Sequence, residues 1–141
     1  KKWSNGKTGF PIVDAGMREL NETGIMHGRS RLITANFLTR LYGINWRVGE
    51  MYYARRLIDY DPAVNNGNWQ WVASVGVDTK HHSMRIFNPL TQHKKFDPEC
   101  EYVKKWVPEL SDKSIIEIFD MYPDDEYKKM RLDSIKMWNA E

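Results

Sequence analysis

The most distinctive chemistry in this sequence lies in residues 59–71, which read DYDPAVNNGNWQW. The segment holds two carboxylates, three asparagines and two indoles. Asparagine inside a helix costs stability unless its amide has a partner, and amides and indoles suit the edges and faces of a flat heteroaromatic ligand. The segment therefore indicates a binding site for such a molecule. A second interpretation stays open, in which Asp61 simply caps a helix and Asn66-Gly67 makes a polar turn.

Two arginines, Arg29 and Arg31, lie two positions apart within an expected helix. Side chains at that spacing point to different sides of a helix. One arginine can therefore face a carboxylate such as Asp59 while the other faces solvent or a phosphate group. The alternative is a pair of solvated arginines whose aliphatic stems are buried.

A third stretch, Arg85-Ile-Phe-Asn88-Pro89 followed by Gln92, combines a cation, an aromatic ring and amides. This mixture suits a surface that contacts phosphates and bases of a nucleic acid. A purely structural loop explains the same residues equally well.

Other chemistries lack the spacing that they require. The four histidines and the lone Cys100 form no metal-binding pattern, so we predict no metal site. Gly6-Lys7-Thr8-Gly9 lacks the upstream glycine and the preceding strand of a phosphate-binding loop. No stretch approaches the roughly 18 to 20 apolar residues of a membrane span. A single cysteine favours a reducing compartment, so we expect an intracellular location and do not distinguish cytoplasm from nucleus.

The apolar spacing is helical almost throughout, and no alternating strand pattern occurs. We therefore predict one all-α unit. Pro11 should open the first helix and Gly24 should end it. Helices are expected over 13–20, 29–41, 46–58, 64–75, 99–106, 114–121 and 124–138, with a loop over 76–98.

Several motifs together resemble one known family. They are GKTGFPIVDAGMR from Gly6, MHGRSR from Met26, INWRVGE from Ile44, the segment 59–71, RIFNP from Arg85, and KFDP with WVPEL up to Leu110. In this order, over residues 3–110, they resemble the DNA photolyase and cryptochrome family, and their wording is closest to class I pyrimidine-dimer photolyases. The resemblance implies the C-terminal part of a helical FAD-binding domain over 1–110, with a divergent helical tail of the same domain over 111–141.

The resemblance also implies roles for individual residues. FAD would be the cofactor, held by Arg31, Asp59, Tyr60, Asp61 and Asn65. Electrons would reach the flavin through Trp69 and Trp46, and Asn65 would face the reactive ring. Damaged double-stranded DNA would be contacted by Gly28, Arg29, Trp71, Arg85 and Gln92.

The implied function is light-driven repair of cyclobutane pyrimidine dimers by electron transfer from reduced FAD. Gly28 departs from the pattern, because class I enzymes usually carry an asparagine there that helps to bind the lesion. A cryptochrome-like flavoprotein without repair activity, or a non-catalytic photolyase remnant, is therefore the alternative. The resemblance further implies a partner in the missing N-terminal half of a photolyase. We expect the 141 residues alone to bind FAD weakly or not at all and to be inactive.

Overall fold

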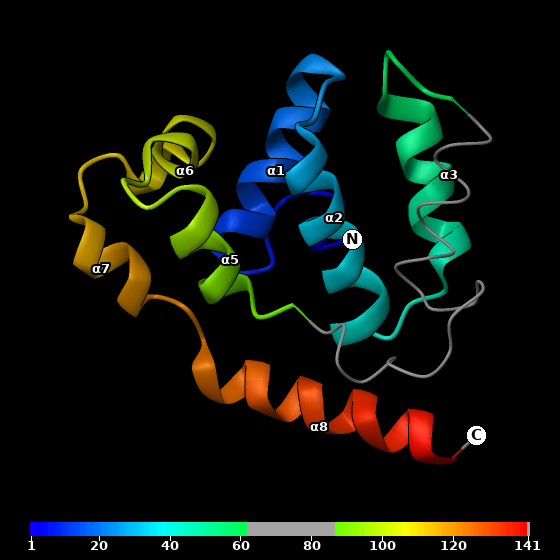
Figure 1. The fold of residues 1–141 in the computed structure, drawn as a ribbon. Helices are drawn as coiled ribbons and strands as arrows, with labels where there is room; N and C mark the ends of the chain where they lie inside the picture. Colours follow the sequence, from blue (N-terminus) through cyan, green and yellow to red (C-terminus); the bar gives the residue numbers. More distant parts are fainter. Residues whose placement is uncertain (62–86, 141) are drawn as a thin grey trace.

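A computed structural model of the chain describes residues 1–61 and 87–140 (Figure 1). Within these ranges the chain is helical and contains no strand, which confirms the predicted all-α class. The elements are α1 (Pro11–Thr23), α2 (Gly28–Asn36), the π-helical turn η1 (Phe37–Leu41), α3 (Trp46–Arg56), α5 (Pro89–Phe96), α6 (Glu101–Trp106), the 3-10 turn η3 (Pro108–Leu110), α7 (Ile115–Asp120) and α8 (Asp124–Ala140).

Helix α1 is the central element, and it packs against α2, α5 and α6. Pro11 occupies its first turn, and Gly24 ends it with a left-handed backbone at φ +74°. Its fully buried side chains include Ile12, Met17 and Leu20, and burying a side chain of this size contributes about 1.5–3 kcal/mol. The predicted start and stop of this helix are confirmed.

Helices α1 and α2 approach closely where α1 carries a glycine. A β-carbon at Gly16 would lie 3.0 Å from Thr34 Cγ2, so a side chain there would require the Thr34 side chain to shift. The indole of Trp3 donates a 2.9 Å hydrogen bond to the Thr34 carbonyl and stacks on Tyr53 at 5.9 Å between ring centroids. These contacts fix α2 and α3 relative to each other.

The end of α3 is tied to the turn between α1 and α2. The Ile58 amide donates to the Gly24 carbonyl at 2.8 Å. Asn45 caps the start of α3 by accepting from the Arg47 amide at 2.9 Å. Because both ends are fixed, the residues that follow α3 lie beside α2.

The loop predicted over 76–98 is wrong for Pro89–Phe96, which form α5. The Asn88 side chain accepts from the Leu90 amide at 3.0 Å, and Pro89 needs no hydrogen-bond partner at the first helical position. The Asn-Pro pair is thus a helix start and not a turn. The helix predicted over 64–75 and residues 76–86 of that loop lie outside the described residues.

A buried polar network, the His93 network (His93, Asp97 and Tyr122), joins α5 to α1 and to the segment ahead of α8. The Tyr122 hydroxyl accepts from the Ile12 amide at 2.9 Å and lies 2.8 Å from His93 Nδ1. His93 Nε2 lies 3.3 Å from Asp97 Oδ2, and the Asp97 carboxylate also accepts from two backbone amides of α6 at 3.0 and 3.1 Å. Because the Tyr122 oxygen accepts from the Ile12 amide, the Tyr122 hydroxyl can donate its proton to His93 Nδ1. The imidazole then carries its proton on Nε2, which faces Asp97.

The Gly-Lys-Thr turn binds a carboxylate of the chain itself. Asp14 in α1 accepts from the Thr8 amide at 2.8 Å, the Thr8 hydroxyl at 2.6 Å and the Gly9 amide at 3.0 Å. Burial raises the pKa of Asp14 despite these bonds. These three bonds therefore hold the turn against α1. The Thr8 and Gly9 amides donate to Asp14 and are not available to bind a phosphate.

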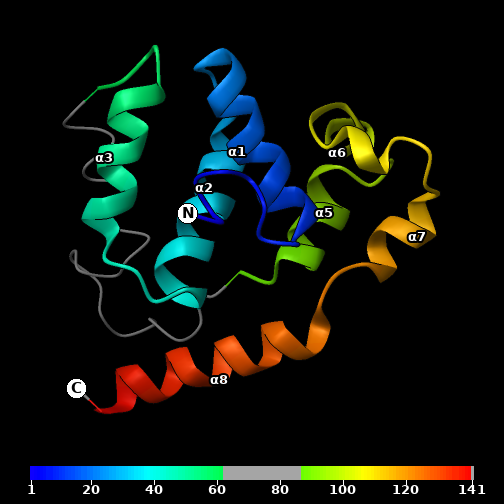
Figure 2. The same cartoon turned by 180° about the vertical axis from the view of Figure 1, so that it is seen from behind.

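The last two helices complete the fold around the same core. Ser114 and Glu117 form a reciprocal capping box at the start of α7. Helix α8 packs against η1 and runs along one side of the molecule, as Figure 2 shows from behind. Across the described residues, none of the helices combines the length and the apolar character needed to cross a bilayer.

Candidate functional site

Arg31 and Asp59 form the ion pair around which the site is built. Arg31 Nη2 donates to both carboxylate oxygens of Asp59 at 2.9 Å, and Arg31 Nε donates to the Met26 carbonyl at 2.8 Å. The expectation that one of the two arginines faces Asp59 is met. The side chains remain 30% and 64% exposed, and a pair this exposed contributes only about 0–1 kcal/mol to folding. Its ordered geometry is therefore better suited to recognition than to stability.

The backbone beneath this pair is held by Tyr53 of α3. The Tyr53 hydroxyl lies 3.3 Å from the Arg31 carbonyl and makes a short hydrogen bond with the Thr34 hydroxyl. Burial raises the pKa of Tyr53, so its hydroxyl keeps its proton. Helix α3 is thus bonded to α2 directly behind the arginine.

Tyr60, the residue after Asp59, connects the ion pair along the chain to Glu50 of α3, and we call these four residues the Arg31 cluster (Arg31, Asp59, Tyr60 and Glu50). The Tyr60 hydroxyl donates to Glu50 Oε1 at 3.4 Å. Glu50 Oε2 is buried and has no hydrogen-bond partner among the residues that the structure describes. A buried carboxylate oxygen without a partner is costly, so this atom indicates that a hydrogen-bond donor beyond the described residues completes the cluster.

Trp46 lies on the same face of α3 as Glu50, one helical turn earlier. Its side chain is 9% exposed, and the Arg47 guanidinium lies 5.2 Å from the ring centroid. An indole one turn from a buried carboxylate could accept or pass an electron, and the nearby cation would affect the energy of its charged state.

The start of α2 lies next to the end of α5. Gly28 and Arg29 are both exposed, and the Arg29 amide donates to His27 Nδ1 at 3.0 Å. The His27 ring lies 5.1 Å from that of Phe96 in α5, and the half-buried Gln92 is one turn before Phe96 on the same helix. The structure therefore brings these three predicted DNA contacts to neighbouring elements.

The remaining predicted site residues are Asn65, Trp69, Trp71 and Arg85, which all lie outside the described residues. Asp61, at the end of the described range, is exposed. The roles assigned to all of these residues stay predictions.

Sequence reasoning gave Glu50 no role of its own. The available signal was a glutamate four residues after a tryptophan, which places both on one helix face, but the sequence does not reveal that the carboxylate is buried without a partner. In residues 1–61 and 87–140, no group of three or more metal-binding side chains gathers at one place.

The described part of the site fits the expected flavin. A paired cation and carboxylate, an unsatisfied carboxylate oxygen and an adjacent indole are the groups that can bind the polar edge of a flat cofactor and exchange electrons with it. The fit rests chiefly on Glu50 Oε2, because that atom needs a hydrogen-bond donor that residues 1–61 and 87–140 do not supply.

Comparison with known proteins is consistent with this geometry. A family model described as the FAD binding domain of DNA photolyase matches residues 1–138. The deoxyribodipyrimidine photo-lyase of Alkalihalophilus pseudofirmus is 53% identical over 135 residues, covering 93% of this chain and 28% of that protein. The deoxyribodipyrimidine photo-lyase of Escherichia coli is 57% identical over 110 residues, covering 78% of this chain and 23% of that protein.

Two solved structures share the fold. An archaeal photolyase from Sulfolobus tokodaii, described with two FAD molecules, superposes with a TM-score of 0.91 at 42% identity, over 99% of this chain and 34% of that one. A Synechocystis cryptochrome superposes with a TM-score of 0.81 at 40% identity, over 92% of this chain and 27% of that one. The chain spans about a quarter of the length of the curated relatives that it matches.

Proposed function

Because this chain belongs to the family of the FAD binding domain of DNA photolyase, we propose that it forms the C-terminal part of such a domain and serves light-driven repair of cyclobutane pyrimidine dimers in DNA. Residues 1–110 and 111–141 are then parts of one domain. The remaining part of the enzyme would be the N-terminal half of a photolyase, on the same or on a separate polypeptide.

The observation that carries this proposal is the Arg31 cluster. It joins α2 to the segment after α3 through two 2.9 Å bonds, and one buried carboxylate oxygen receives no donor from the described part of the chain. Arg31, Asp59, Tyr60 and Asp61 would hold FAD together with Asn65. When bound, reduced FAD supplies the electron that splits a dimer under light.

The chain's own residues would serve the cofactor in two ways. Arg31 would hold the Asp59 carboxylate in place for the cofactor through its two hydrogen bonds. Trp46 and Trp69 would relay electrons, since indoles are readily oxidised and Trp46 lies on the Glu50 face of α3.

The DNA surface would lie at the start of α2. Arg29 is exposed in the first turn of the helix, where backbone amides also favour a phosphate. Gln92 on the neighbouring α5 would add a further contact. Trp71 would stack on the extruded lesion and Arg85 would contact the backbone.

The test uses a chimera in which this chain replaces the matched region of the Alkalihalophilus pseudofirmus photolyase. We expect the purified chimera to show a flavin absorption spectrum and to repair a dimer-containing oligonucleotide under blue light but not in the dark. The Arg29→Ala chimera is the matched control for DNA binding, and it should keep the flavin while losing affinity for the damaged duplex. A chimera that folds without flavin would contradict the proposal.

Gly28 favours a second candidate, a cryptochrome-like flavoprotein without repair. Glycine has no side-chain amide to offer, and among the described residues no atom lies within 4 Å of the position that a β-carbon would take at this exposed site. The same space admits an asparagine, and the Gly28→Asn chimera tests its role. Flavin binding without repair in the parent, with repair gained in Gly28→Asn, would favour the second candidate.

A further inference from the structure

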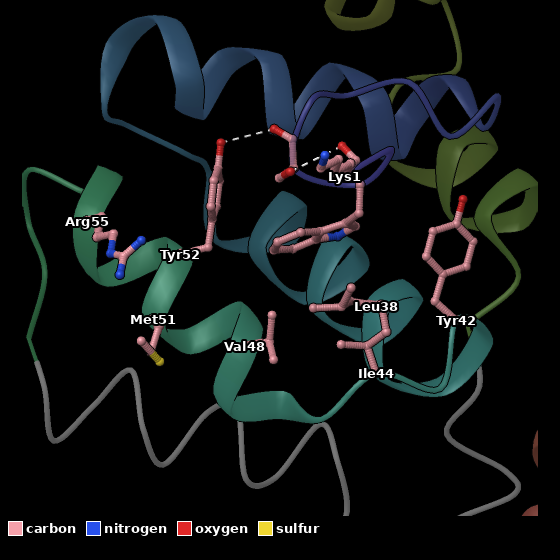
Figure 3. Close-up of a pocket in the computed structure, with 10 residues that line it drawn as sticks. Lys1, Leu38, Tyr42, Ile44, Val48, Met51, Tyr52 and Arg55 are labelled. Carbon is pink, nitrogen blue, oxygen red and sulfur yellow. Dashed lines mark hydrogen bonds between the residues drawn. The ribbon is translucent and has the colours of Figure 1, made fainter.

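An apolar groove of about 380 Å³ lies between η1, α3 and the N-terminal loop (Figure 3). We call it the α3 groove. Its apolar lining comes from Trp3, Leu38, Ile44, Val48, Met51 and Tyr52. It lies on a different side of α3 from the Arg31 cluster, whose Glu50 is not among its lining residues.

Three of the apolar side chains that line the groove are exposed. Ile44 is 38%, Val48 55% and Met51 54% exposed. On α3 the lining positions 48, 51, 52 and 55 follow the spacing of one helix face. The other face of α3, with Trp46 and Tyr53, is already buried against the core. Helix α3 therefore has the pattern of a helix packed between two neighbours, with only one neighbour present in the described residues.

The charge of the groove limits what can cover it. Lys1 and Arg55 line it, and no carboxylate occurs among the described residues that do so. A complementary surface would be apolar along one stripe with an acidic side chain beside that stripe.

The lengths of the relatives indicate where such a surface could come from. This chain corresponds to 28% of the Alkalihalophilus photolyase and to 34% of the archaeal photolyase, whose fold it matches over 99% of its own length. In those proteins the same helices are accompanied by two to three times as much further polypeptide. Lys1 lines the groove, so polypeptide joined ahead of residue 1 could reach it without a long connection.

We propose that the α3 groove is the docking site for a helix from the remaining part of a photolyase polypeptide, apolar on one face and carrying an acidic residue next to that face. This inference rests on the proposed function, because it takes the partner to be photolyase polypeptide. It adds the surface through which the two parts assemble.

The experiment is a thiol footprint. Cys100 is the only cysteine of the chain and is fully buried, so a cysteine placed at an exposed position reports on that position alone. Met51→Cys places a thiol in the groove. Ile116→Cys, on α7 and 72% exposed, is the control away from it. Maleimide labelling rates are compared for both variants in the unattached chain and in the chimera, with the cysteines of the Alkalihalophilus part replaced by serine.

We expect the ratio of the Met51→Cys rate to the Ile116→Cys rate to fall at least about tenfold in the chimera, because labelling would then require local opening. An unchanged ratio overturns the proposal. Protection of Met51→Cys in the unattached chain that grows with protein concentration would identify a second copy as the occupant and also overturn it.

The docking site and the proposed function can be rejected independently of each other. Flavin absorption is recorded on the same chimeric samples. Protection without flavin would keep the docking site and reject cofactor binding, whereas flavin without protection would keep the function and reject the docking site.

Discussion

The His93 network and the Arg31 cluster are both built from a basic side chain, a carboxylate and a tyrosine hydroxyl, yet they differ in how they are completed. His93 is fully buried and Asp97 is 8% exposed, and their partners come from α1, α6 and Tyr122. His93 Nε2 makes no hydrogen bond but faces the Asp97 carboxylate at 3.3 Å. In the Arg31 cluster, Asp59 is 64% exposed, and no described residue donates to Glu50 Oε2.

The difference separates structural polar groups from binding groups. In the His93 network the polar atoms face groups of the chain itself, backbone amides among them, so the network fixes helices relative to one another. A cluster that leaves a buried oxygen unsatisfied has a cost in the unliganded chain that a ligand can remove. The following substitutions test that distinction, from the largest expected effect to the smallest.

Asp97→Ala should give the largest loss of stability. It removes the acceptor for two α6 amides and the partner of His93, all inside the core. We expect the free energy of unfolding in urea to fall by about 3 kcal/mol. Asp112→Ala, at an exposed position, is the control and should be close to neutral. A loss below 1 kcal/mol for Asp97→Ala would mean that the network does not hold the helices together.

Tyr122→Phe should give a smaller loss. The substitution keeps the ring and removes the hydroxyl that serves the Ile12 amide and His93 Nδ1. Two buried groups are left without a partner, so we expect a loss of about 1–3 kcal/mol in the same urea titration. An unchanged denaturation midpoint would contradict the assigned hydrogen bonds.

The decrease in the free energy of unfolding at acidic pH should depend on Asp97. Burial acts to raise the pKa of Asp97, but contacts with His93 and the α6 amides lower it below its usual value of 3.8. The folded pKa is then below the unfolded one, so the stabilisation is present above about pH 4 and is lost as the pH falls through the folded pKa. Asp97→Asn should flatten the decline of the unfolding free energy below pH 4, and an equally steep decline would contradict this cause.

The sequence predicted the helices well where their ends are set locally. Pro11 and Gly24 bound α1, and Ser114 caps α7, because each acts on its own neighbouring backbone. The same local logic failed at Asn88-Pro89, since an asparagine cap followed by proline starts a helix as readily as it makes a turn.

The site was only partly predictable, because its contacts are distant in sequence. The opposite orientations of Arg29 and Arg31 follow from helix geometry, and Asp59 was the nearest suitable carboxylate in the distinctive segment. Nothing local indicates that Glu50 Oε2 is buried without a partner among the described residues, or that Tyr122 reaches Ile12, 110 residues away. His93 is not part of a metal-binding spacing, and no local feature of the sequence indicates that it lies in the core.

Glu50→Gln should have a small effect on stability, in the opposite direction to the core substitutions. Glutamine keeps the oxygen that accepts from Tyr60 and removes a buried charge. We expect the unfolding free energy of the chain to rise by up to about 1 kcal/mol, while FAD binding by the chimera weakens. A clear loss of stability would show that Glu50 serves the fold rather than a ligand.

The central claim is that the Arg31 cluster binds FAD, and the paired arginines of α2 test it most directly. FAD is titrated into the apo forms of the Arg31→Ala and Arg29→Ala chimeras, and binding is followed by the quenching of flavin fluorescence. We predict that Arg31→Ala raises the Kd at least about tenfold, which corresponds to roughly 1.4 kcal/mol, with a change in unfolding free energy below about 1 kcal/mol. Arg29→Ala should leave the Kd unchanged. Equal FAD affinities for the two variants would contradict the claim.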